Sequence, residues 1–128
     1  MSYYYRNGSG HKFFVFNFDA YFNGEDIYRS YLRSRQIAEA PEVFGGKRLP
    51  AYSYGHPDLY IMCKKNENSM AVGLWNMFAD EIDKPIIELD DCYKRIDFIN
   101  CSGKIEGNKV YLSSIMPFSF AAFEVFYD

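Results

Sequence analysis

Short apolar segments that alternate with polar residues, each bounded by turn residues, fill the second half of the chain. In the segment 95–101, the apolar side chains of Ile96 and Phe98 alternate with the charged side chains of Arg95 and Asp97. Because successive side chains of a strand point to opposite faces, this alternation predicts a strand with one buried face. Antiparallel sheets suit such strands, since one of their faces can lie in water.

Turn signals between these segments favour a β-sandwich. The clearest is Gly107-Asn108, a two-residue hairpin turn. An aromatic content of 20 %, with 12 Tyr and 12 Phe, suits the pleated surface of strands. We therefore expect a mainly β fold, an antiparallel β-sandwich with one accessory α-helix near the N-terminus. The predicted strands are 59–64, 70–78, 86–89, 95–101, 104–106, 109–112 and 118–127.

The accessory helix is predicted at residues 24–38. Asn23 is a suitable N-cap, and Asp26 three residues later resembles a capping box. Pro41, followed by two glycines, is expected to end the helix. The apolar residues that share one face at helical spacing are Ile27, Tyr28, Tyr31, Leu32 and Ile37.

Composition divides the 128 residues into three parts. Residues 1–10 look flexible because they end in Gly-Ser-Gly. Residues 11–49 are expected to form a strand–helix adapter that packs on the sandwich, with a doubly buried strand at 13–18. Residues 50–128 are expected to form the sandwich. The connector at 45–57, which is rich in Gly, Pro and Tyr, spans the boundary between these two parts.

Charge argues against two classes of partner. The net charge is −3, and basic residues do not form the stripe that a nucleic-acid binder needs to neutralise phosphates. An acidic chain also gives no reason to expect an anionic membrane surface as partner. No apolar stretch reaches the length of a membrane-spanning helix, and the first residues lack the apolar core of a signal peptide. The expected location is therefore the cytoplasm.

The cysteines and histidines do not predict a metal or a cofactor. Three cysteines, Cys63, Cys92 and Cys101, give an odd count without paired spacing, which argues against a disulfide scaffold. Cys63 and Cys101 lie in apolar runs and are expected to behave as small hydrophobic residues. No C-x-x-C occurs, and His11 lies far from His56 in the sequence, so we expect no zinc site.

No catalytic residue is predicted for this chain. G-x-S-x-G is absent, and no cysteine neighbours a histidine in the sequence. Two carboxylates at a suitable separation can act as the acid and base of a glycosidase, but neighbours in one loop rarely hold that geometry. Solvated loop charge is therefore favoured over catalysis or calcium binding for Asp80, Glu81, Asp83, Glu88, Asp90 and Asp91.

The candidate ligand-binding residues lie in two segments. Tyr52, Tyr54, His56 and Asp58 combine aromatic rings with groups that bond hydroxyls, which is the chemistry of a carbohydrate contact. The alternative, which we favour, is that these tyrosines close the end of the sandwich and bond backbone groups. Trp75 is the only tryptophan and lies in a strand with two apolar faces, so it is either a sugar platform or, as we favour, core or domain-interface packing.

The segment N-K-V-Y-L-S-S-I-M-P-F-S-F-A-A-F-E-V at 108–125 resembles the last strands of C-terminal β-sandwich domains in bacterial glycoside hydrolases. The stretches 46–52, 56–60 and 71–76 are similar to segments of large glycosidase-like proteins, where the helix at 28–37 would close the preceding domain. The resemblance implies a C-terminal domain that packs on a catalytic domain and sometimes contacts sugar. It carries over no catalytic residue.

The expected function is therefore that of a non-catalytic accessory domain of a carbohydrate-active enzyme, with a role in domain packing. One alternative is a carbohydrate-binding module that uses the aromatic residues named above. Another is a small free-standing protein, including a small enzyme. The expected partners are the catalytic domain of the parent protein, an oligosaccharide, or a second copy bound through exposed aromatic residues such as those of 13–18.

Overall fold

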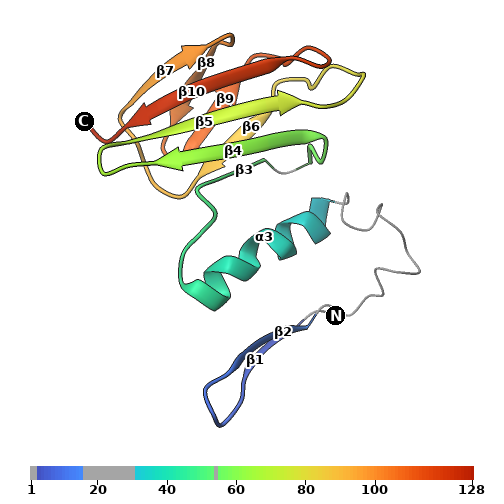
Figure 1. Ribbon diagram of the computed structural model, residues 1–128, viewed down its shortest axis with the longest axis vertical. Coiled ribbons are helices and arrows are strands. Elements are labelled where there is room, and N and C mark those ends of the chain that lie inside the picture. Colours follow the sequence, from blue (N-terminus) through green and yellow to red (C-terminus); the bar gives the residue numbers. More distant parts are fainter. Residues whose placement is uncertain (1–2, 16–30, 54) are drawn as a thin grey trace. The chain divides into compact units, whose positions relative to one another are not determined.

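The computed structural model describes residues 3–15, 31–53 and 55–128 (Figure 1). The chain divides into two compact units, Met1–Arg48 and Leu49–Asp128, which are described separately below. The division falls next to the boundary that the composition predicts between residues 49 and 50.

The first unit contains a hairpin of two antiparallel strands, β1 (Tyr3–Arg6) and β2 (Lys12–Val15). Asn7 holds the turn, because its Oδ1 accepts a hydrogen bond from the backbone N–H of His11 at 2.8 Å. Gly10 supplies the positive φ of 84° that the turn needs. Strand β1 was not predicted, since it lies in the segment expected to be flexible. The predicted strand at 13–18 is described only as far as residue 15.

A helix of this unit, α3 (Tyr31–Gly45), ends later than predicted. The start predicted at residue 24 lies outside the described residues. The end predicted at residue 38 is wrong, because the helix continues through Pro41. Termination comes instead at Gly46, whose φ of 67° allows its N–H to bond the carbonyl of Glu42 at 2.8 Å.

A lysine from the hairpin reaches the C-terminal end of this helix. Lys12 Nζ donates hydrogen bonds to the carbonyl oxygens of Val43 and Phe44, at 3.4 and 3.0 Å. The last carbonyls of a helix have no partner within it, and its C-terminus carries partial negative charge. Lys12 satisfies both needs and thereby links β2 to α3.

The second unit is a sandwich of two antiparallel four-stranded sheets (Figure 1). One sheet has the order β4-β5-β10-β7 and the other has the order β3-β6-β9-β8. The strands of the first are β4 (Leu59–Lys65), β5 (Ser69–Asn76), β10 (Phe120–Phe126) and β7 (Arg95–Ile99). The strands of the second are β3 (Ala51–Ser53), β6 (Ile86–Leu89), β9 (Lys109–Leu112) and β8 (Gly103–Glu106).

Alternate residues of the strands fill the space between the sheets. Phe123 of β10 is buried there, as is Val72 of β5, which pairs with it. Cys63 and Cys101 pack against this core, as small hydrophobic residues would. Over the residues that the structure describes, it confirms a mainly β sandwich with one helix near the N-terminus. The other core residues on the strands are Ala51, Leu59, Met70, Leu74, Ile87, Leu89, Val110, Leu112, Ala121 and Val125.

Three predicted strands are shorter in the structure, each for a local reason. Strand β5 ends at Asn76, whose side chain bonds the following loop rather than continuing the sheet. Strand β7 ends before Asn100, which has a φ of 55°. Strand β10 begins only at Phe120, because Phe118 has a φ of 50°. Such φ values interrupt the extended backbone of a strand. Strand β3 lies in the segment that was expected to be a connector.

Candidate functional site

Three aromatic side chains form a row across the outer face of the β4-β5-β10-β7 sheet. Tyr60, Trp75 and Phe120 are directly opposite one another in the pairing of β4, β5 and β10. The ring centroids are 5.9 Å apart for Tyr60 and Trp75 and 5.0 Å apart for Trp75 and Phe120. Interplanar angles of 59° and 47° make the row uneven rather than flat. Tyr60 and Phe120 are exposed, and Trp75 is half-buried.

Gly73 leaves the space that the indole ring of Trp75 occupies on the same strand. A Cβ atom at position 73 would come within 2.7 Å of Cη2 of Trp75, a distance that real Cβ atoms do not show. Only glycine therefore permits this ring position. The next row across the sheet contains Met62, Gly73, Ala122 and Ile99, of which Met62 and Ile99 are exposed. The apolar surface thus spans all four strands.

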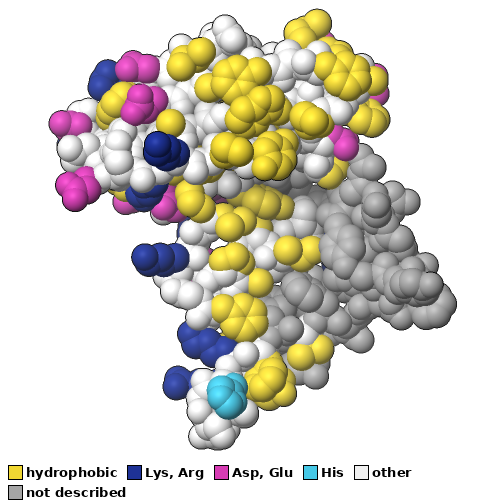
Figure 2. All heavy atoms as spheres, in the orientation of Figure 1, with side chains coloured by type: hydrophobic (Ala, Val, Ile, Leu, Met, Phe, Trp, Pro, Cys, Tyr) yellow, Lys and Arg dark blue, Asp and Glu magenta, His cyan; other side chains and the backbone are white. Residues whose placement is uncertain are grey.

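Two loops extend this surface beyond the end of the aromatic row. The backbone N–H of Phe118 bonds the carbonyl of Phe78 at 3.3 Å, so the loops after β5 and before β10 lie side by side. Figure 2 shows the resulting concentration of hydrophobic side chains over one end of the sandwich. We call this surface the apolar face. Its exposed members are Tyr60, Met62, Met77, Phe78, Ile99, Met116, Phe118 and Phe120, with Trp75 half-buried among them.

Asn76 fixes both loops from inside the sandwich. Its buried side-chain Nδ2 donates to the carbonyls of Asp80, Ile115 and Met116 at 2.8, 3.1 and 3.1 Å. Its Oδ1 accepts from the N–H of Phe78 at 3.0 Å. Each bonding group of the amide is occupied, which is what a buried amide needs in order not to destabilise the fold.

Phe118 combines an unusual backbone with an exposed side chain. It follows Pro117 in a turn and has a φ of 50°, a region that favours glycine or asparagine. Its side chain is 74 % exposed, so burial within this chain does not offset the strain. Strained residues of this kind cluster at binding sites.

A charged row lies beside the apolar rows on the same sheet face. Lys64, Ala71, Glu124 and Asp97 are opposite one another on β4, β5, β10 and β7. Glu124 accepts a hydrogen bond from Ser69 Oγ at 2.7 Å. The positive charge of this row lies on β4, and the negative charges lie on β10 and β7.

Arg95 stands next to the charged row on β7. Its guanidinium lies 2.9 Å from Asp97 and 3.8 Å from the ring centroid of Phe126. Both partners of the ion pair are exposed, so the pair contributes at most about 1 kcal/mol to stability.

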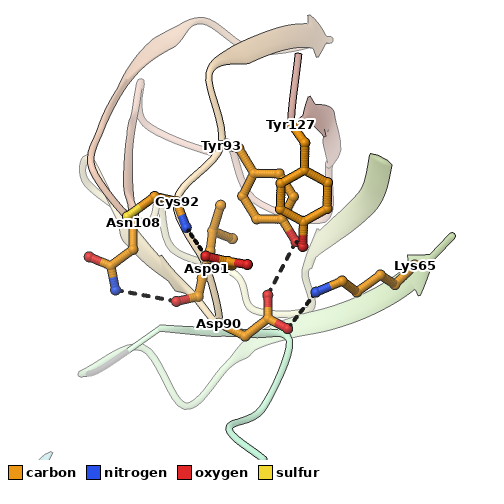
Figure 3. Close-up of polar contacts among 8 residues, drawn as sticks. Lys65, Asp90, Asp91, Cys92, Tyr93, Asn108 and Tyr127 are labelled. Carbon is orange, nitrogen blue, oxygen red and sulfur yellow. Dashed lines mark hydrogen bonds and ion pairs between the residues drawn. The ribbon is translucent and has the colours of Figure 1, made fainter. Parts of the chain in front are cut away.

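A second cluster joins β4 to the β6–β7 loop and to the C-terminal segment (Figure 3). Lys65 Nζ binds Asp90 at 2.8 Å, and the Tyr93 hydroxyl donates to the other carboxylate oxygen at 3.2 Å. The Tyr127 hydroxyl lies 3.4 Å from that of Tyr93, and the two rings stack at a centroid distance of 4.5 Å. The cluster holds three segments together.

The protonation states of this cluster do not suit catalysis. The hydrogen bond to Asp90 raises the pKa of Lys65, so the amine stays charged and is not nucleophilic. Burial, with the bond to Tyr127, raises the pKa of Tyr93 and keeps the phenol neutral. Burial likewise raises the pKa of Cys63 to about 11, far from a reactive thiolate. We interpret the cluster as structural.

The residues predicted as a carbohydrate site do not all come together. Tyr52 lies on the outer face of the other sheet, between the inward-facing residues of β3. Tyr54 lies outside the described residues. His56 and Asp58 lie in the turn before β4, and the Asp58 carbonyl accepts a bond from the N–H of Met77 at 3.3 Å. This turn therefore borders the apolar face that contains Trp75.

Sequence reasoning missed most of the apolar face. Tyr60 and Met62 alternate with the inward-facing residues of β4, and this alternation already marks them as outward-facing. Met116 gave no pattern signal, because it lies in a loop whose position depends on Asn76. Phe118 is predicted as the first residue of a strand, but it lies in that loop instead.

Among the described residues, no group of three or more His, Cys, Asp or Glu side chains is arranged to hold a metal ion. Within residues 3–15, 31–53 and 55–128, no helix has the length and hydropathy needed to cross a membrane. The three cysteines are free thiols.

No known protein family, curated protein or solved structure matches the chain. Function is therefore inferred from the geometry of the chain itself.

Proposed function

We propose that this chain is a non-catalytic accessory domain of a carbohydrate-active enzyme and that its apolar face docks on another protein surface. The observation that carries the proposal is the exposure of eight large apolar side chains on one sheet face and the two adjoining loops. Contiguous apolar patches of this kind on a folded domain mark interaction sites. The fold holds them in place through Asn76 and Gly73.

The chemistry of the face favours a protein surface over a sugar. Sugar rings need flat aromatic platforms with hydroxyl-bonding groups at their edges, whereas these three rings are tilted against one another by 47° and 59°. Their neighbours on the face are methionine and isoleucine, and methionine is adaptable at protein interfaces. The charged row begins about 13 Å from Trp75 along the strand.

The link to carbohydrate metabolism rests on the resemblance of residues 108–125 to the closing strands of glycoside hydrolase accessory domains. In those proteins the sandwich packs on the catalytic domain. The raised pKa values of Lys65 and Tyr93 agree with a structural rather than a catalytic role. Free thiols suit a reducing compartment, so the proposal places the chain in the cytoplasm.

A photo-crosslinking amino acid at position 118 tests the docking proposal in the protein's own cells. The matched control carries the same amino acid at Lys109, which is exposed on β9 of the other sheet. The proposal predicts a protein adduct from position 118 and none from position 109. A carbohydrate-active protein in the adduct supports the accessory role, whereas equal labelling from both positions, or none from position 118, contradicts docking.

A carbohydrate-binding module is the second candidate, because three aromatic side chains lie in register on one sheet face. Trp75 is the only tryptophan, so its fluorescence reports directly on ligands at this site. Saturable changes on titration with a panel of oligosaccharides, lost in Tyr60→Ala and kept in Lys109→Ala, support this candidate. The docking proposal predicts no response to any member of the panel.

A further inference from the structure

We infer that the surface matched to the apolar face is a second copy of this chain, related by a twofold axis that lies between the two faces and runs parallel to the strands. The inference rests on the proposed function and names its partner. It follows from the strand order, the pairing register and the charges of a single sheet.

The strand order decides what each side chain would meet. A twofold axis parallel to the strands keeps each row at the same height and reverses the order β4-β5-β10-β7. Strand β4 of one copy then lies over β7 of the other, and β5 lies over β10. The alternative axis, across the strands and over the middle row at Gly73, would set the aromatic row against the charged row.

The charged row becomes complementary to itself in this arrangement. Lys64 of each copy faces Asp97 of the other, and Glu124 of each copy faces the small side chain of Ala71. The β4–β5 half of the row carries the positive charge of Lys64. The β10–β7 half carries the negative charges of Glu124 and Asp97, which outnumber the positive charge of the neighbouring Arg95. Opposed charges across an interface select the partner and the register.

The aromatic row also meets a matching surface. Trp75 of each copy faces Phe120 of the other, because both lie in the same row on the two central strands. Aromatic pairs of this kind stabilise interfaces beyond the area that they bury. Aligned sheets pack at an angle of about 30°, so these central contacts are kept while the corners diverge.

The sheet part of the apolar face supplies about half of the area that a standard interface needs. Four strands about 4.8 Å apart and seven residues that rise about 3.3 Å each span roughly 19 by 23 Å, before the two loops are added. The sheet alone gives about half of the roughly 800 Å² that each partner buries in a standard interface, and the two loops add to it. Phe118 lies in one of these loops, where a contact with the second copy would offset its backbone strain.

Sedimentation equilibrium of the full chain, over about 1 to 500 µM, tests the inference. We expect a reversible dimer. Lys64→Glu and Asp97→Lys each set two side chains of the same charge against one another, at both of the contacts that the twofold axis relates. Each should raise the dissociation constant about tenfold or more. The double variant restores opposite charges and should return within about threefold of the parent chain.

Lys109→Glu on the other sheet is the matched control and should leave the dissociation constant unchanged. All of these positions are exposed, and far-UV circular dichroism verifies that each variant folds. A chain that stays monomeric at every concentration overturns the inference. So does a dimer whose dissociation constant is unchanged by Lys64→Glu, or a double variant whose dissociation constant is higher than those of both single variants. If the chain is a monomer but position 118 still crosslinks to another protein, the second copy is ruled out as the partner and the docking proposal stands. If the chain is a monomer and position 118 forms no crosslink, the docking proposal is rejected as well.

Discussion

The backbone of Phe118 has a φ of 50° although its side chain is 74 % exposed. Burial of the side chain within the chain therefore does not offset the strain of this residue. Replacing it with Asn, which tolerates this backbone region, should stabilise the sandwich by about 0.5–1 kcal/mol. Urea denaturation followed by Trp75 fluorescence measures the change. A loss of stability would show that Phe118 contributes packing to the fold itself.

The side chain of Asn76 bonds both loops of the apolar face. Replacing it with Ala leaves three carbonyls and one N–H without their partner, which should lower the free energy of unfolding by about 2–4 kcal/mol. Asn108→Ala removes one side-chain bond to Leu89 and should lower it by less than about 1 kcal/mol. Equal effects in chemical denaturation would contradict this role of Asn76.

At the scale of secondary-structure elements, local pattern was sufficient to place β4, β6 and the β8–β9 hairpin. Strand β6 matches its predicted range, β4 extends its predicted range by one residue, and Gly107-Asn108 joins β8 to β9 as expected. The sequence pattern did not predict strands or ends of elements that depend on a backbone angle or on a contact distant in the sequence. Strand β3 is only three residues long and depends on pairing with β6, and Gly46 rather than Pro41 ends α3.

The candidate site was predicted less well than the strands, for a related reason. Trp75 was singled out because it is the only tryptophan, and it does lie on the apolar face. Tyr52 was grouped with it by sequence, but the two lie on opposite sheets of the sandwich. Which outward-facing residues share a surface depends on strand order, and alternation within one strand does not determine that order.

The cluster that links β4 to the β6–β7 loop should weaken at alkaline pH. The pKa values of Lys65, Tyr93 and Cys63 are all raised, by the bond to Asp90 for Lys65 and by burial for the other two. The folded state therefore holds protons that the unfolded state releases, so stability falls as pH rises. For Cys63 the window runs from its ordinary value of 9.0 to about 11.

Thermal melting between about pH 7 and 11 measures this fall. Cys63→Ala removes one of the three groups and should make the loss of stability shallower. Asp90→Asn removes the main cause of the shift at Lys65 and should destabilise the sandwich already at neutral pH. Stability that stays constant up to pH 11 would contradict the account of the cluster.

At the scale of the whole molecule, all core residues of the sandwich lie in the unit Leu49–Asp128. A fragment of residues 49–128 should therefore fold by itself, with one cooperative thermal transition and the Trp75 emission of the full chain. A broad, non-cooperative transition would show that residues 1–48 complete the core.

The central claim, that the apolar face is covered when the protein functions, is tested most directly by methionine oxidation. Met62, Met77 and Met116 are 55, 66 and 60 % exposed on this face, whereas Met70 is fully buried in the core and serves as an internal control. Exposed methionines react with peroxide to form sulfoxides that mass spectrometry locates. In the protein taken from its own cells, the account predicts slow oxidation at all three positions and faster oxidation in the dilute isolated chain. Equally fast oxidation of these three methionines in both samples, with Met70 protected, would contradict it.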